Sequence, residues 1–176
     1  MLKLLSVIIL IPFMLISQEE SESTGWDVLR YFEGKWMGEG KGKSGNSKLE
    51  REYRYILGGK YLYVVNRAEF EPLEGGSKGE VHENIDYYSY DRIRGKVVLR
   101  QFHIEGFVNR YIIDSLSTDK QTLIFETEHM ENMPDGWKAR ITIKILTDDE
   151  FLEYFDLAAP DKEFGCYIEN RFKRMK

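Results

Sequence analysis

Residues 29–42 read LRYFEGKWMGEGKG, and the hydrophobic pattern of the chain changes within this stretch. At its start, Trp26, Leu29 and Phe32 recur at helical spacing, which predicts one short helix. From Trp36 onward the period changes to two, as in a β-strand. The stretch therefore predicts a short helix that leads directly into a long run of strands.

The rest of the chain predicts ten β-strands joined by turns. No connector has the length and periodicity of a crossover helix, so we expect antiparallel pairing. A run of this length leaves no unpaired edge when it closes on itself. We therefore expect an all-β fold, a ten-stranded antiparallel up-and-down β-barrel with one short N-terminal helix. The expected strands span residues 36–41, 49–57, 61–71, 80–90, 96–103, 107–114, 122–128, 137–146, 150–157 and 166–174.

The N-terminal segment, residues 1–17, is predicted to be a signal peptide. Lys3 precedes an apolar run, and Ser17 is a small residue at a plausible cleavage point. The run is shorter than the about 20 residues that a spanning helix needs, so we expect no stable membrane insertion after cleavage. An uncleaved anchor is the alternative. Residues 18–25 are predicted to be a disordered linker and residues 26–176 a single barrel domain, in a secreted or periplasmic protein.

Composition and motifs limit the function classes. The net charge of −5 disfavours nucleic acid as a partner, because binding phosphates needs a basic face. Cys166 is the one cysteine, which excludes an internal disulfide, and its strand predicts a buried thiol. We find no nucleophile elbow and no ordered Ser/His/Asp set, so we expect no enzyme. These features favour a binding protein.

The tripeptide Gly34-Lys35-Trp36, directly after the predicted helix, resembles the opening of the calycins, the superfamily of lipocalins and fatty-acid-binding proteins. In lipocalins this Trp closes one end of the barrel, and an Arg near the end of the last strand packs across it. The resemblance implies a barrel-end structural pair of Trp36 and Arg174, with Arg171 as the alternative partner. It also implies a small hydrophobic or amphipathic molecule bound in the interior.

The same opening, together with VHEN at residues 81–84, resembles the nitrobindin-like haem-binding barrels. An uncharacterised bacterial branch of these barrels is similar at RQFHIEGFVN (100–109) and GWKAR (136–140). The resemblance implies haem as a cofactor, in nitric oxide or peroxide chemistry. Those barrels hold haem through a His near the C-terminal strand, and the last strand here, CYIENRFKR, has none. His103 and His129 are the possible haem ligands.

Ligand-binding candidates follow from residue chemistry. A planar guanidinium matches a carboxylate, so Arg and Tyr side chains inside a barrel are typical of a site for an acidic ligand. His82 alternates with polar neighbours, which predicts that it faces solvent. His103 and Glu105, two apart on a strand, and the carboxylates of residues 126–131 around His129 are the alternatives for a metal site. Solvated charge is favoured over both, so we predict no metal site. An interaction domain whose barrel is filled by its own side chains is a further alternative. The predicted ligand-binding residues are Arg100, His103, Tyr111 and Arg140.

Overall fold

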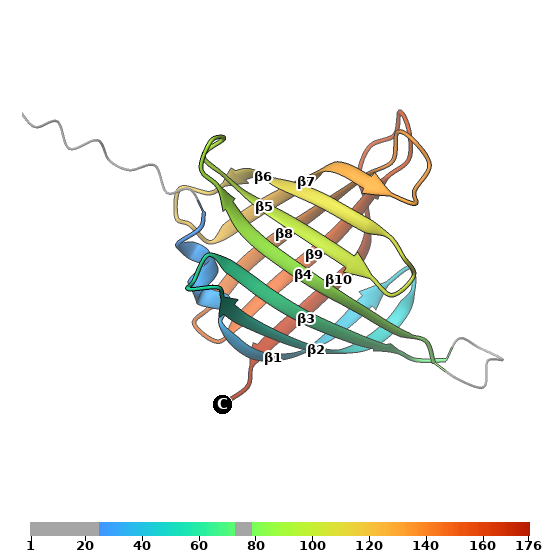
Figure 1. Cartoon of the computed structure of the whole chain (residues 1–176). Coiled ribbons are helices and arrows are strands. Elements are labelled where there is room, and N and C mark those ends of the chain that lie inside the picture. Colours follow the sequence, from blue (N-terminus) through green and yellow to red (C-terminus); the bar gives the residue numbers. More distant parts are fainter. Residues whose placement is uncertain (1–24, 73–78) are drawn as a thin grey trace, which may run out of the picture.

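The computed structural model describes residues 25–72 and 79–176, and these form a closed barrel of antiparallel strands (Figure 1). Each strand pairs with its neighbours along the chain, and β1 pairs with β10 to close the ring. The expected up-and-down barrel and all ten expected strands are therefore confirmed. The predicted signal peptide and most of the predicted linker lie outside the described residues. The strands are β1 (Gly34–Gly42), β2 (Gly45–Ile56), β3 (Tyr61–Phe70), β4 (Val81–Asp91), β5 (Lys96–His103), β6 (Val108–Leu116), β7 (Thr122–Glu131), β8 (Lys138–Thr147), β9 (Glu150–Ala158) and β10 (Gly165–Arg174).

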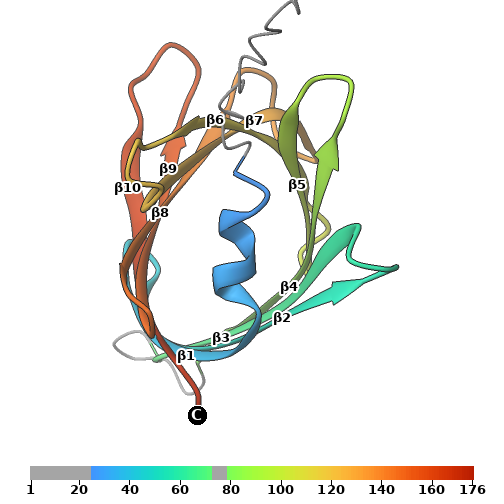
Figure 2. The same ribbon diagram turned by 90° about the vertical axis from the view of Figure 1, so that its left-hand side faces the viewer.

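The expected N-terminal helix is a single 3-10 helix of five residues, η1 (Val28–Phe32). Leu29 and Phe32 are buried beneath it. The helix is followed by Gly34, whose φ of 117° is a conformation that glycine adopts without steric cost. Figure 2 shows this helix in front of one end of the ring of strands. Within the described residues, no helix has the length and apolar character needed to cross a membrane.

Trp36 is fully buried at the helix end of the barrel. Its indole Nε1 donates a hydrogen bond to the Phe32 carbonyl at 2.7 Å, and its ring lies 4.8 Å from the ring of Phe151. The Arg174 guanidinium carbon lies 4.2 Å from the Trp36 ring centroid, at a cation–π distance. The structure thus brings together Trp36 and Arg174. The alternative partner, Arg171, is exposed on the outer face.

Register shifts at two of the β-bulges change which residues of a strand face outward. In the β6–β7 pair the register shifts between Arg110 and Tyr111, where Arg110 pairs with His129 and Tyr111 with Thr127. The extra residue places His129 on the outer face, where it is exposed. A register shift between Cys166 and Ile168 in β10 also leaves Cys166 exposed. The prediction of a buried thiol is therefore wrong.

A polar cavity at the open end of the barrel

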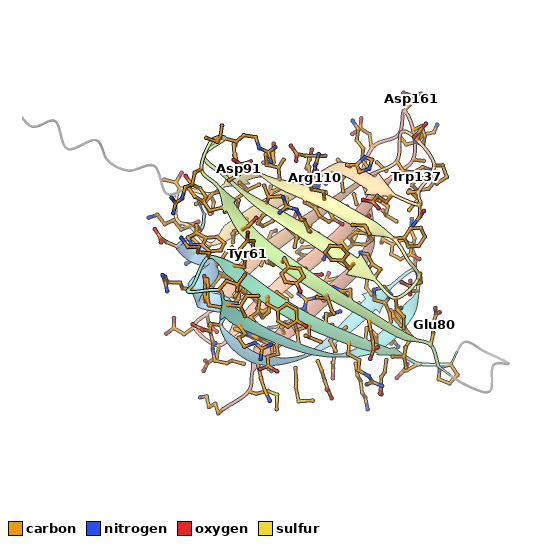
Figure 3. All side chains as sticks on the ribbon, in the orientation of Figure 1. Tyr61, Glu80, Asp91, Arg110, Trp137 and Asp161 are labelled. Carbon is orange, nitrogen blue, oxygen red and sulfur yellow. The ribbon has the colours of Figure 1, made fainter. Side chains whose placement is uncertain are left out.

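A cavity of about 410 Å³ lies inside the barrel, away from η1. Its rim includes residues from the connections at that end, among them Ser44, Glu80, Glu105 and Met133. Figure 3 labels Glu80 at this end of the barrel, whereas Tyr61 lies toward the other. Apolar side chains make up part of the wall: Leu49, Ala68, Phe70, Phe107, Met130, Ile141, Phe155, Leu157 and Ile168. The cavity is therefore apolar on part of its wall and polar elsewhere.

A buried ion pair lies deep in this cavity. Arg51 donates to both carboxylate oxygens of Glu153, with N–O distances of 2.6 and 2.8 Å. The same guanidinium donates to Asn66 Oδ1 at 2.7 Å and lies 4.3 Å from the Phe172 ring centroid. Burial raises the pKa of Glu153, but the facing Arg51 outweighs it, so the pKa is lowered. The carboxyl is therefore held ionised, as a partner for the guanidinium.

A row of side-chain amides continues from this pair across the inner faces of β3, β4 and β5. Asn66 Nδ2 donates to Asn84 Oδ1 at 2.9 Å, and Asn84 Nδ2 donates to Asp86 Oδ1 at 2.6 Å. Gln101 Nε2 donates to Asp86 Oδ2 at 3.1 Å. Burial raises the pKa of Asp86 to about 6, although Arg51 and these hydrogen bonds oppose the shift. The row thus ends at a buried acid that titrates near neutral pH.

A second series of hydrogen-bonded side chains lies at the mouth of the cavity. Asn109 Nδ2 lies 3.2 Å from His103 Nε2, and His103 Nδ1 lies 3.3 Å from His82 Nε2. His82 Nδ1 lies 2.7 Å from Glu105 Oε1. Burial, together with the neighbouring His82, lowers the pKa of His103 to about 4. His103 is therefore a neutral imidazole at neutral pH, able both to donate and to accept a hydrogen bond.

Two of the four predicted ligand-binding residues lie inside the barrel. His103 lines the cavity, and Tyr111 is fully buried, with Asn109 donating to its hydroxyl at 3.3 Å. Arg100 lies on the outward-facing positions of β5 and donates to Ser89 Oγ. Arg140 is likewise on the outer side of β8, bonded to Asp156. The structure does not bring the two arginines together with His103 and Tyr111.

Some residues that line the cavity were not predicted from the sequence. His82 was expected to face solvent, but it lines the cavity together with Asn84, so that expectation is wrong. The inner positions of β4 can be polar because His82, Asn84 and Asp86 are bonded to side chains of β3 and β5. Arg51 was also missed, although it shares strand parity with Leu49, a signal that could have placed it inside.

The cavity residues do not fit haem. His82 and His103 line it and could supply an imidazole ligand, so the mismatch lies with the acidic groups of haem. Haem carries two carboxylates, and Arg51 is the one Arg or Lys among the described lining residues. Both carboxylate oxygens of Glu153 accept hydrogen bonds from its guanidinium. The cavity therefore offers no free cation to receive them.

Comparison with known proteins supports the fold. No family model matches the sequence, and no curated protein matches it. Among solved structures, Rv2717c from M. tuberculosis is similar, with a TM-score of 0.63 and 16% identity, over 88% of this chain and 99% of that one. EF1p2_mFAP2b bound to DFHBI has a TM-score of 0.42 and 9% identity, over 87% and 100%. The redesigned β-barrel b11L5F_LGL has a TM-score of 0.40 and 10% identity, over 89% and 99%. The likeness to Rv2717c is one of fold alone.

Proposed function

We propose that the protein is a non-enzymatic binding barrel that holds a small amphipathic molecule in the cavity. The observation that carries the proposal is the cavity of about 410 Å³, which is within the size range of small-molecule sites. The calycin-like opening and the Trp36–Arg174 contact at the closed end support it. An interaction domain filled by its own side chains is disfavoured, because the lumen is not filled.

The lining restricts the chemistry of the ligand. Apolar side chains such as Leu49, Ile141 and Phe155 suit a hydrocarbon or aromatic body. Asn109 and Asn170 line the cavity and are buried, and the Oδ1 atom of each has no hydrogen-bond partner. A buried acceptor without a donor is costly, so a ligand with N–H or O–H groups is favoured over a pure hydrocarbon. The rim carboxylates Glu80 and Glu105 disfavour an anionic ligand.

Secretion or export to a periplasm is part of the same proposal, and it rests on the sequence of residues 1–17. A ligand carrier outside the cytoplasm would meet molecules of poor solubility in water. Native mass spectrometry of the gently purified protein, followed by solvent extraction, is the direct search for such a cargo. A retained small molecule supports the proposal.

A matched pair of variants tests the site itself. Ala68 is a small residue on the cavity wall, and Val65 is exposed on the outer face of the same strand. We expect Ala68→Phe to weaken binding of the neutral dye Nile red at least tenfold, because the new ring enters the lumen. Val65→Phe should leave the affinity unchanged. Equal affinities in folded Ala68→Phe and wild-type protein, together with no retained molecule, would overturn the proposal.

A further inference from the structure

His82, His103 and Glu105 form a cluster at the mouth of the cavity that the ligand proposal does not use. His82 comes from β4, His103 from the end of β5, and Glu105 from the turn that follows. One nitrogen from each imidazole and one carboxylate oxygen lie within 4.8 Å of one another. Within residues 25–72 and 79–176, no other group of His, Cys, Asp or Glu side chains meets this condition.

The hydrogen-bond partners fix which nitrogens face each other. The Asn109 amide nitrogen can only donate, so His103 Nε2 accepts and the proton of the neutral ring is on Nδ1. This Nδ1 points at His82 Nε2, which accepts, and His82 Nδ1 then donates to Glu105. Each ring is therefore held at its far nitrogen, by an amide in one case and a carboxylate in the other. The two near nitrogens are 3.3 Å apart.

This separation suits a metal ion. A tetrahedral site with Zn–N bonds of about 2.0–2.1 Å places two nitrogens about 3.3–3.4 Å apart. Metal-binding histidines almost always donate the N–H of their other ring nitrogen to a carboxylate or another acceptor, which orients the ring. Glu105 accepts from His82 in this way. Asn109 lies against His103 Nε2, and a half-turn of its amide presents Oδ1, an atom without a hydrogen-bond partner, as the acceptor.

We propose that His82 Nε2 and His103 Nδ1 bind a divalent transition metal ion such as Zn²⁺, with Glu105 and Asn109 holding the two rings in place. The ion takes the place of the proton on His103 Nδ1, and that proton moves to Nε2, which donates it to Asn109 Oδ1 after a half-turn of the Asn109 amide. Imidazole is a ligand that Zn²⁺, Cu²⁺, Ni²⁺ and Fe²⁺ share. Water or a polar group of a molecule in the cavity occupies the remaining positions.

The surroundings support a cation here. Arg51 is the one Arg or Lys among the described lining residues, and Glu153 neutralises it. Glu80 and Glu105 add negative charge at the rim. Asn109 is buried beside His103, and its Oδ1 has no hydrogen-bond donor. The Nε2–H of a metal-bound His103 is a donor of the kind that this oxygen lacks.

The third histidine of the chain provides the control, because His129 is exposed on the outer face. Zn²⁺ binding to the purified chain, stripped with EDTA and then dialysed, is measured by calorimetry, and Co²⁺ binding by its visible absorption. We expect one ion per chain, with affinity at least tenfold weaker in His82→Gln and in His103→Gln and unchanged in His129→Gln. Glu105→Gln should weaken binding by about tenfold or more, as for other partners of metal-bound histidines.

Circular dichroism and thermal unfolding confirm that each variant is folded. Should His103→Gln fail to fold, His82→Gln decides alone. An absence of binding to the wild type, or equal losses in all three histidine variants, would overturn the metal proposal. Neither result affects the Nile red test, so the two proposals stand or fall separately.

Discussion

Arg51 and Glu153, which are 102 positions apart in the sequence, form a bidentate ion pair across the lumen of the barrel. Their strands, β2 and β9, are not neighbours, because β1 and β10 lie between them in the ring. Both side chains are about nine-tenths buried. The pair separates the aromatic core at the helix end from the cavity at the other end, so it forms part of the floor of the proposed site.

Removal of one partner should be far more harmful than removal of both. Glu153→Gln leaves the Arg51 charge buried without its counter-ion, and we expect a loss of about 3–5 kcal/mol in the free energy of unfolding. The double variant Arg51→Met/Glu153→Leu should lose less than the sum of its single variants. Urea unfolding of the wild type, Arg51→Met, Glu153→Leu and the double variant measures this coupling.

The exposed pair Lys41–Glu169, 3.7 Å apart, serves as the control for that cycle. Lys41→Met should cost less than about 1 kcal/mol, because solvent screens the charges. If Glu153→Gln were no more destabilising than Lys41→Met, the structural role assigned to the buried pair would be refuted.

Asp86 should make stability depend on pH. Its pKa is raised from 3.8 to about 6 by burial, with Glu153 adding to the shift and Arg51 opposing it. Between about pH 4 and 6 the folded protein therefore binds a proton that the unfolded chain has released, and stability falls as pH rises through this window. The destabilisation is complete above pH 6 and relieved below pH 4.

Comparison of wild type with Asp86→Asn isolates this effect, since the other titrating groups are common to both. The free energy of unfolding of Asp86→Asn relative to wild type should increase by about 2–3 kcal/mol between pH 4 and pH 7. Urea unfolding at several pH values provides the measurement. A difference that stays constant with pH would show that Asp86 titrates normally.

The strands were predictable because their signals are local. The alternation of apolar and polar residues depends on only a few neighbouring residues. The same holds for the turns between strands, such as Gly58-Gly59. Alternation shows which side chains share a face, but it does not show which face is inside. His82 and Asp86 share a face of β4 that looks polar enough for solvent, and the structure places it inside.

The site residues depend on features that no short segment contains. The bulge in β7 turns His129 outward, although its strand parity with Phe125 predicts the inside. One extra unpaired residue reverses the alternation, and no glycine or proline marks it. The partners Arg51 and Glu153 could each have been placed on an inward face from their strands, but their contact across the lumen depends on barrel closure.

Arg174 should stabilise the closed end through its shape as well as its charge. Its Nη2 donates to the Tyr31 carbonyl at 2.6 Å and its Nη1 to the Glu33 carbonyl at 2.8 Å, while the guanidinium covers Trp36. Lysine cannot reproduce this planar fork. We expect Arg174→Lys to lower the free energy of unfolding by about 1–3 kcal/mol and to change the fluorescence of Trp36.

Arg171 offers the matched substitution on the same strand. It is exposed and pairs with Glu150 at 2.7 Å on the outer face. Arg171→Lys should change stability by less than about 0.5 kcal/mol, as is usual at the surface. Equal effects of the two substitutions would contradict a specific role for Arg174 in closing the barrel.

Gly38 is required by the close approach of β1 to β10. A Cβ atom at this position would lie 2.6 Å from the Arg171 carbonyl oxygen and 2.9 Å from the Phe172 ring. The carbonyl belongs to the backbone of a paired strand, so it cannot move aside without distorting the β1–β10 pairing. The Phe172 ring is also fixed, since it stacks on Phe151 with centroids 4.8 Å apart.

Gly38→Ala should therefore destabilise the barrel by about 1–3 kcal/mol, the usual cost of overpacking a filled interior. Because Phe172 also supports the Arg51 guanidinium at 4.3 Å, the strain should reach the cavity floor and weaken Nile red binding. Glu39→Ala, on the outer face of the same strand, should change neither quantity. Unfolding and dye titration of the two variants test this link, and a Gly38→Ala protein as stable as wild type would disprove it.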